Sequence, residues 1–388
     1  MISIYVDVVG AWDRYVSNHP EATLYHLSPW KSIISKAYAH QTYYLMAFSD
    51  SDGSVRCRTL PAAPKFTDNP KIAEAITEST AKPTGILPLV HLKHFLFGNS
   101  LISLPFVDTG GILADNEEIE KLLLLEATRI ARNLKVDRIE LRHMEPRIWL
   151  AADATPLRQL NCELSVQTLS HKMRMILELP DKPEILLSSF KAKLRSQIKK
   201  SLKEGLTARI GNMELLDDFY DVFSANMRDL GSPVHSKKLI EHTTAEFPDN
   251  AKLIVVYKRG GQPLACSLVI GFRDTLANPW ASSLRQYSIL SPNMLLYWTM
   301  LEYACDQNYR YFDFGRSSLG EGTYDFKKQW GATALPLNWQ YVYLHGRSLQ
   351  PEPVLDKDRF KKAIAYWRKL PLPVTKILGP RIRKHIGL

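Results

Sequence analysis

The order of predicted secondary-structure elements repeats along the chain, and this repeat restricts the fold more than any single motif. Helix, strand, strand, strand, helix, strand occurs twice. In the first half these elements are predicted at residues 29–38, 42–48, 85–92, 100–104, 116–134 and 136–142. In the second half they are predicted at 236–247, 252–257, 264–272, 276–284, 292–307 and 310–314. Strands and helices in this order are typical of α/β units with a mixed sheet, so we expect two tandem α/β domains.

Two prolines mark the expected junction between the halves. Residues 172–179 alternate as a strand that closes the first domain, and Pro180 and Pro183 follow it. We therefore predict domains at 1–180 and 181–345 and a tail at 346–388. Residues 50–84 are polar and contain four prolines, and we predict an insertion in the first domain there.

Composition excludes several classes of protein. The four cysteines are far apart and the eleven histidines show no ligand spacing, so we expect neither a metal site nor a disulfide framework. No run approaches 18 apolar residues, and the first residues lack the basic region of a secretory signal. These features favour a protein of the reducing cytoplasm.

The net charge of +10 is concentrated in the tail. Residues 345–388 hold eleven Lys and Arg against three Asp and Glu, a net charge of +8. Two amphipathic helical segments, 358–370 and 374–386, interleave these cations with apolar residues. The pattern suits an anionic membrane surface, which would make the protein peripheral at the inner face of the membrane. The alternative is a helical tail that is docked on the domain and exposes a solvated basic face.

A second basic segment, residues 191–203, is predicted to be a helix without a single acidic residue. An apolar stripe at four-residue spacing leaves the lysines and arginines on the remaining surface. Arg195, Lys199 and Lys200 are the candidates for contacts with nucleic acid or phosphate. The alternative is an ordinary solvated surface helix.

Residues 309–331 are predicted to form a strand, a glycine-rich turn and a short helix. Three glycines let backbone N–H groups approach a ligand closely. The polar residues of the turn and of the helix that follows it are Arg316, Ser317, Ser318, Glu321, Lys327 and Lys328. They suit an anionic ligand or a developing oxyanion. The alternative is a tight connection in which the glycines only turn the chain.

This stretch carries a family resemblance. F-D-F-G-R-S, then G-E-G-T-Y-D-F-K-K-Q-W-G and P-L-N-W-Q-Y, resembles the closing motif of FemAB-like acyltransferases, most closely the subgroup found beside exosortase (PEP-CTERM) loci. The resemblance covers most of the chain and is strongest over residues 191–343. It implies two tandem GNAT-like domains, each a mixed sheet flanked by helices, and transfer of an acyl or aminoacyl group to an amine.

The resemblance also suggests roles for individual residues. Arg316 and Lys327 would stabilise an anion, and Asp313 would act as the base or orient the amine. The alternative for Asp313 is a structural salt bridge at the end of a strand. Ser317, Ser318, Glu321, Tyr324 and Lys328 would contact substrate. Tyr287, Asn293 and Tyr297 would line the groove, and the alternative is that they are ordinary helix-start and core residues. Strand alternation places Asp313 and Arg316 on opposite faces, so a shared pocket requires the turn at Gly315 to redirect Arg316.

The donor and the acceptor stay open at the level of sequence. The R-x-x-G-x-G loop of acyl-CoA enzymes is absent from both expected places, residues 105–115 and 285–292. No ATP site or resident cofactor is expected, and the candidate donors are aminoacyl-tRNA and acyl-CoA. The acceptor is expected to be a lipid-linked or polysaccharide cell-envelope precursor, belonging to exopolysaccharide or peptidoglycan. The alternatives are a CoA-dependent acetyltransferase acting on polysaccharide and a non-catalytic binding domain.

Overall fold

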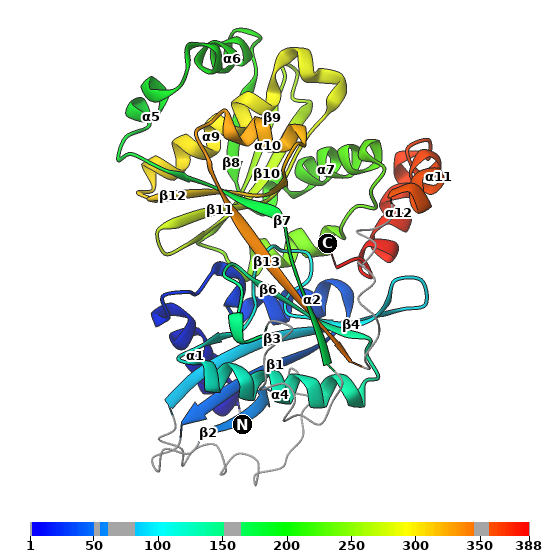
Figure 1. The fold of residues 1–388 in the computed structure, drawn as a ribbon. Coiled ribbons are helices and arrows are strands. Elements are labelled where there is room, and N and C mark those ends of the chain that lie inside the picture. Colours follow the sequence, from blue (N-terminus) through cyan, green and yellow to red (C-terminus); the bar gives the residue numbers. More distant parts are fainter. Residues whose placement is uncertain (1, 50–54, 61–81, 151–163, 345–356, 388) are drawn as a thin grey trace.

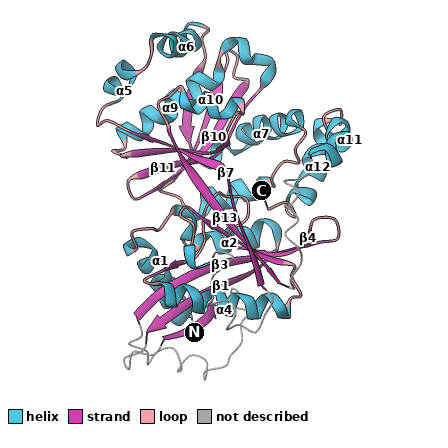
Figure 2. Ribbon diagram, in the orientation of Figure 1, coloured by secondary structure: helices cyan, strands magenta, loops and turns pink. Residues whose placement is uncertain are grey.

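The computed structural model describes residues 2–49, 55–60, 82–150, 164–344 and 357–387. One large mixed sheet runs through them in the order β2-β1-β3-β4-β6-β13-β7-β12-β11-β10-β9-β8, with β5 beside β3 (Figure 1). The first half contributes α1 (Ile2–Asn18), η1 (Leu24–His26), α2 (Pro29–Tyr38), β1 (Gln41–Ser49), β2 (Val55–Leu60), β3 (Lys82–His94), β4 (Gly98–Ile102), β5 (Leu113–Ala114), α4 (Glu117–Asn133), β6 (Arg138–His143), η2 (Ile148–Leu150) and β7 (Leu164–Glu178). Helices cover the sheet along its length (Figure 2).

The second half repeats much of this series and ends in two additional helices. It contributes α5 (Pro183–Ser189), α6 (Ala192–Lys203), β8 (Thr207–Gly211), η4 (Met213–Leu215), α7 (Leu216–Leu230), α8 (Lys237–Glu246), β9 (Ala251–Tyr257), β10 (Pro263–Phe272), β11 (Thr275–Ser283), η5 (Arg285–Leu290), α9 (Pro292–Asp306), β12 (Tyr311–Ser318), α10 (Gly322–Lys328) and β13 (Thr333–Leu344). The tail contributes α11 (Lys357–Trp367) and α12 (Leu372–Arg383).

The two halves have matching topologies. Strands β1, β3 and β4 are antiparallel neighbours, α4 crosses over, and β6 returns parallel to β4. Likewise β9, β10 and β11 are antiparallel neighbours, α9 crosses over, and β12 returns parallel to β11. A parallel pair requires such a crossover. The predicted fold class of two tandem mixed-sheet units flanked by helices is therefore confirmed.

The last strand of each half pairs with a strand of the other half. Strand β7 follows β6 in the chain but pairs with β12, whereas β13 follows β12 and pairs with β6. The two exchanged strands also pair with each other, antiparallel, across the middle of the sheet (Figure 1). A boundary near residue 180 therefore divides the chain but not the sheet, and the residue limits of the two domains stay a prediction.

The halves also share a hydrophobic core. One cluster joins Trp30 and Phe106 of the first half to Phe219 and Trp280 of the second half, all of them buried. The ring centroids of Trp30 and Trp280 are 6.5 Å apart. Because apolar burial is the main stabilising term in folding, this common cluster couples the stability of the two halves.

Only part of the predicted insertion at 50–84 lies within the described residues, and the insertion stays a prediction. Residues 55–60 form the edge strand β2, which pairs antiparallel with β1, and β3 begins at residue 82. The pairing satisfies backbone groups of β1 that a polar loop would leave open at this edge. Residues 50–54 and 61–81 of the predicted insertion lie outside the described part of the chain.

The tail is docked on both halves of the molecule. Helix α12 packs on α7, and a Cβ placed at Gly379 would lie 2.9 Å from Val234. Beyond α12, the carbonyl of Gly387 accepts hydrogen bonds from the backbone N–H of Phe106 (2.9 Å) and from Arg142 (2.7 Å). This is the docked alternative raised by the sequence. Of the residues described, none belongs to a helix long and apolar enough to cross a bilayer.

Candidate active site

A bulge in β12 begins the site. Asp313 lies opposite Ile176 of β7, but Arg316 lies opposite Arg174, so two residues of β12 face one of β7. The bulge includes Gly315, whose φ of +72° is unfavourable for residues with a side chain. The extra residue cancels the strand alternation between Asp313 and Arg316. The bulge at Gly315 therefore redirects Arg316, as a pocket shared with Asp313 requires.

Two ion pairs lie at this bulge. The Nε of Arg174 is 2.7 Å from an Asp313 carboxylate oxygen, and Arg316 Nη1 is 3.0 Å from Asp108 Oδ1. The second oxygen of each carboxylate accepts a backbone hydrogen bond, from Gly315 N–H to Asp313 (2.8 Å) and from Arg316 N–H to Asp108 (3.1 Å). We call Asp108, Arg174, Asp313 and Arg316 the Arg–Asp cluster. Asp108 and Arg316 come from different halves, so the cluster spans their junction.

Lys327 of α10 holds the bulge from the other side. Its ammonium donates hydrogen bonds to the carbonyls of Gly315 (3.2 Å) and Arg316 (2.7 Å). Burial lowers the pKa of Lys327 to about 8, although the nearby carboxylates of Asp108 and Asp313 oppose this effect. The lysine is therefore a cation whose charge changes near neutral pH beside the cluster.

Aromatic side chains enclose the cluster. The guanidinium carbon of Arg316 lies 5.4 Å from the ring centroid of Trp339, and the indole N–H of Trp339 donates to the backbone carbonyl of Asp108 (3.0 Å). Tyr25 is buried, and its pKa is raised by that burial and further by the charges of Asp108 and Asp313. These contacts reduce the solvent around the charges, which strengthens their interactions.

Two hydroxyls follow the cluster on β12. Ser318 Oγ accepts a hydrogen bond from the ammonium of Lys172 (2.6 Å). Ser317 is buried, and its Oγ has no partner within the described residues. A buried hydroxyl without a partner is costly unless a ligand or water satisfies it. Both residues therefore stay candidates for substrate contacts.

The other predicted substrate residues lie in η5, in α9 and at α10, and contact with substrate stays a prediction for them. Tyr297 lies in the aromatic core, with its ring stacked 5.7 Å from Phe314, because α9 is buried around most of its circumference. Tyr287 donates to Gln262 (3.2 Å). Asn293 is half-buried at the start of α9. At α10, Glu321 and Lys328 are exposed, and the Lys328 ammonium lies 6.0 Å from the Tyr324 ring.

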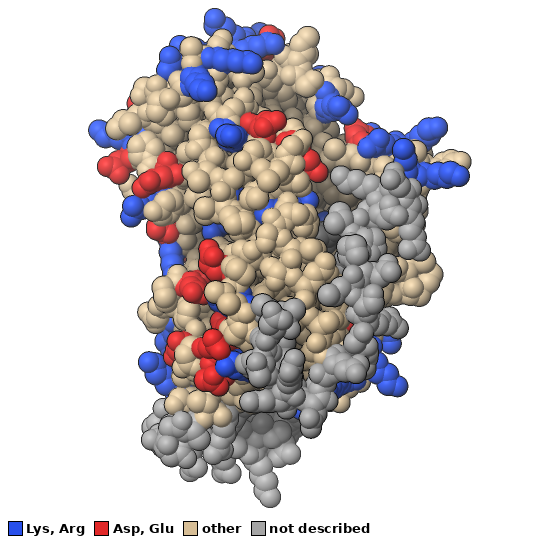
Figure 3. Space-filling view, viewed as in Figure 1, with Lys and Arg blue, Asp and Glu red and all other residues tan. Residues whose placement is uncertain are grey.

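Arg195 makes local structural contacts, and the two candidate lysines of α6 face solvent. Arg195 donates to the carbonyls of Ser188 and Phe190, both at 2.9 Å, and so holds the end of α5. Lys199 and Lys200 are exposed in α6. Lysine and arginine side chains gather at the top of the molecule, where α6 lies (Figure 3). Phosphate binding at this helix stays a prediction for these two lysines, whereas the contacts of Arg195 give it a structural role.

Asp108, Arg174, Tyr25 and Trp339 were not predicted from the sequence. Asp108 lies in a loop with no motif, 208 positions from Arg316. Arg174 occupies a predicted strand, where one arginine among alternating residues is unremarkable. Trp339 is part of the P-L-N-W-Q-Y string that carried the family resemblance, and this was the one available signal.

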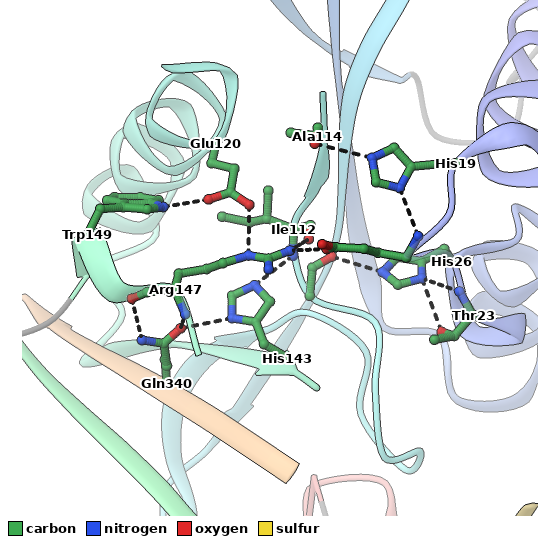
Figure 4. Close-up of polar contacts among 12 residues, drawn as sticks. His19, Thr23, His26, Ile112, Ala114, Glu120, His143, Arg147, Trp149 and Gln340 are labelled. Atoms are coloured by element: carbon green, nitrogen blue, oxygen red, sulfur yellow. Dashed lines mark hydrogen bonds and ion pairs between the residues drawn. The ribbon is translucent and has the colours of Figure 1, made fainter. Parts of the chain in front are cut away.

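A second polar network joins β6 and the loops of the first half to Gln340 of β13 (Figure 4). His143 Nε2 accepts a hydrogen bond from the backbone N–H of Ile112 (3.0 Å), and its Nδ1 lies 3.0 Å from Oε1, the side-chain amide oxygen, of Gln340. Burial lowers the pKa of His143 to about 3 and that of His26 to about 4. Both imidazoles are thus neutral at pH 7, and the contacts of His143 indicate a structural role.

Glycine at position 315 is expected to be required. Gly315→Ala should cost about 1–2 kcal/mol for the left-handed backbone alone. The new Cβ would also lie 3.2 Å from the carbonyl oxygen of Asn278. Gly320→Ala is the matched control, because Gly320 has φ +77° and a Cβ added there would meet no atom of the described residues within 4 Å. Denaturant unfolding should show a larger loss for Gly315→Ala, and equal losses would contradict a role of the bulge in close packing.

Comparisons with known proteins agree with this architecture. Residues 188–328 match the model of the acetyltransferase (GNAT) domain. A crystal structure of FemX superposes with a TM-score of 0.60 at 16% identity, covering 88% of this chain and 97% of that chain. A tandem GNAT protein from the clavulanic acid biosynthesis pathway superposes with a TM-score of 0.50 at 12% identity, covering 88% and 96%.

A third solved structure covers a similar share of the chain. It is the C-terminal domain of a putative lysylphosphatidylglycerol synthetase from Agrobacterium fabrum, with a TM-score of 0.52, 10% identity and coverage of 92% and 96%. No curated protein sequence matches the chain. The chain thus carries a GNAT-type acetyltransferase domain, and its overall fold resembles that of tandem GNAT proteins.

Proposed function

We propose that this protein is a FemAB-like transferase that forms an amide between an acyl or aminoacyl group and an amine of a cell-envelope precursor. The observation that carries the proposal is the group of three cations and two carboxylates around the bulge. Arg174, Arg316 and Lys327 exceed Asp108 and Asp313 by one positive charge when the lysine is protonated. A small excess of positive charge in a partly buried site suits an oxyanion that develops during acyl transfer.

Each group can be given a role in amide formation. The acceptor amine attacks the carbonyl carbon of an ester or thioester, and collapse of the oxyanion expels the alcohol or thiol. Arg316 and Lys327 stabilise the oxyanion. Asp108 is the better base, because its side chain is 19% exposed compared with 8% for Asp313. Both carboxylates have both oxygens engaged, so this difference in exposure is what separates them, and the more buried Asp313 positions the bulge.

The donor and acceptor follow from weaker indications. An aminoacyl-tRNA donor is supported by the exposed lysines of α6 and by the fold shared with FemX. The acceptor is proposed to be a lipid-linked or polysaccharide precursor of peptidoglycan or exopolysaccharide, at the inner face of the membrane. One of the similar structures is a domain of a putative lysylphosphatidylglycerol synthetase, and the name of that protein refers to a lipid. The resemblance to the exosortase-associated subgroup favours exopolysaccharide.

An acyl-CoA donor is the second candidate. It is favoured by the match to an acetyltransferase domain model over residues 188–328. In this case the protein would acetylate an amino sugar of a polysaccharide, with the same oxyanion groups. A protein that only binds its ligand is the third candidate, and it predicts that variants of the Arg–Asp cluster change binding but form no product.

The proposal is tested by identifying the ligand and the reaction together. Native mass spectrometry of the purified protein would detect co-purified CoA, nucleotide or envelope precursor. Amide formation is then assayed with acetyl-CoA and aminoacyl-tRNA offered in parallel to amine acceptors, with Arg316→Ala as the inactive reference. Product from aminoacyl-tRNA supports the proposal, product from acetyl-CoA alone supports the second candidate, and ligand binding without product supports the third.

The pH dependence of transfer should report on Lys327. Its folded pKa of about 8 lies below the unfolded value of 10.5, so the charged form is lost as pH rises through 8. Transfer should therefore fall above about pH 8. Over pH 8 to 10.5 the unfolded state binds more protons at this group, so its contribution to stability should rise. Lys327→Arg, permanently charged, should remove this limb of the pH–rate profile, and an unchanged limb in the variant would exclude Lys327 as its source.

A further inference from the structure

We propose that one side of the molecule, formed by the β3–β4 hairpin tip and the outer faces of α11 and α12, docks on an anionic lipid bilayer. We call it the tail–hairpin surface, and define it by Lys93, Phe95, Leu96, Lys361, Lys362, Tyr366, Lys369, Val374, Ile377, Leu378 and Arg381. The hairpin tip and both helices lie at the same side of the molecule, on the right in Figure 1. This inference refines the membrane location given above and is measured without the transfer reaction.

Large apolar side chains project from this surface. Phe95 is 88% exposed, Tyr366 72% and Ile377 60%, and Leu96, Val374 and Leu378 are also exposed. Single exposed apolar residues are normal, but a group of this size on protruding elements marks an interaction site. A convex hairpin tip with an aromatic and a leucine suits insertion between lipid headgroups better than it suits a groove for a peptide.

Cations surround the apolar residues. Lys93, Lys361, Lys362, Lys369 and Arg381 are all exposed. Blue side chains gather at the right edge of the molecule in Figure 3, over α11. Lys and Arg near the surface of an anionic leaflet add to binding, while the apolar side chains enter the interface. The occupant that matches both features is an anionic lipid surface.

The surface is held as one unit by its inner contacts. The ring of Phe97 in the hairpin lies 6.5 Å from Phe360 of α11, and His94 lies 4.4 Å from His385 beyond α12. Lys376 pairs with Asp221 of α7 (2.5 Å), so this cation of the tail faces inward. Because the inner side of the tail is structural, deletion of residues 356–388 would disturb the fold, and point substitutions on the outer side are the cleaner test.

The test is sedimentation of the full chain with phosphatidylglycerol-containing vesicles and with neutral phosphatidylcholine vesicles. Wild-type protein should bind the anionic vesicles at low salt and be released as salt rises. Lys361→Glu with Lys362→Glu should lower the partition coefficient by roughly thirty-fold or more, from the electrostatic contribution of two lysines. Phe95→Ser with Leu96→Ser, and separately Ile377→Ser with Leu378→Ser, should weaken binding at every salt concentration.

Lys199→Glu with Lys200→Glu is the matched control, because it makes the same charge change on α6. Circular dichroism and thermal melting confirm that each variant is folded. Unchanged vesicle binding in the control, with loss in the other variants, supports the proposal. Equal loss in the control would show general attraction between a basic protein and anionic lipid, and would overturn it. Wild-type protein that does not bind the vesicles would also overturn the proposal. The same holds if light scattering shows, in addition, that the serine variants disrupt a dimer.

Discussion

Arg316→Ala is expected to lower kcat/KM for amide formation by about 10²–10³-fold, the loss typical when one donor to a developing oxyanion is removed. Arg316 is held by Asp108 at 3.0 Å and by the face of Trp339, so its guanidinium is positioned before substrate arrives. A positioned cation needs no reorganisation during the reaction. The measurement is steady-state amide formation with whichever donor the parallel assay identifies.

Arg310→Ala is the matched control for this experiment. Arg310 lies just before the same strand, and its guanidinium pairs with the exposed Glu178 at 3.2 Å. Exposed pairs contribute little to stability, so the variant should keep its full rate. The double variant Asp108→Asn with Arg316→Ala separates loss of the cation from the effect of an unpaired Asp108. If Arg316→Ala turns over like wild type while remaining folded, Arg316 has no part in the chemistry.

Arg142→Met is expected to cost about 3–5 kcal/mol of unfolding free energy, the range for breaking a buried ion pair by removing one partner. The Arg142 side chain is fully buried and lies 2.7 Å from Glu140, which is itself buried. The same guanidinium donates to the carbonyls of Val107 and Gly387. The substitution therefore removes this donor from the buried Glu140 carboxylate and from the Val107 carbonyl. The Gly387 carbonyl keeps its hydrogen bond from Phe106 N–H. Denaturant unfolding followed by fluorescence measures the loss.

The double variant Glu140→Gln with Arg142→Met controls for the unpaired charge. Removing both charges should restore part of the stability, because the main penalty of the single variant is a buried carboxylate without a partner. Losses that simply add in the double variant would contradict the pairing. A single variant as stable as wild type would show that Arg142 does not join β6 to the Val107 loop and the end of the chain.

The repeated order of elements was sufficient to predict the fold class. Alternating apolar residues identified most strands, and the crossover helix α4 followed from the spacing of its apolar residues. The start of α9 followed from Ser291 and Pro292, although the Ser291 side chain makes no capping hydrogen bond. The 309–331 stretch also located three residues that meet at the bulge: Asp313, Arg316 and Lys327. Local patterns succeed here because a strand, a glycine turn and a short helix are determined by neighbouring residues.

The sequence could not show what depends on distant pairing. The partners of the predicted arginine and aspartate are Asp108 and Arg174, one in a featureless loop and one on a strand that crosses into the other half. No local pattern encodes which strand edge will accept β7, because β6 and β12 offer similar edges. For a related reason the sequence left Tyr297 open between a groove and a core position, since a tyrosine at helical spacing looks the same in both; its ring stacks on Phe314 in the core.

The exchange of β7 and β13 also affects how the chain folds during its synthesis. Strand β6 gains its final neighbour only when residues 338–343 have been made, long after β6 itself. At 5–20 residues per second, this interval lasts roughly 10–40 seconds. During that time the newly made first half carries an open strand edge, the kind of feature that pairs with other chains. Strand β7 is the next strand to be made and can pair with this edge. Because β7 pairs with β12 and β13 in the final structure, any such pairing with β6 has to break before the sheet is complete.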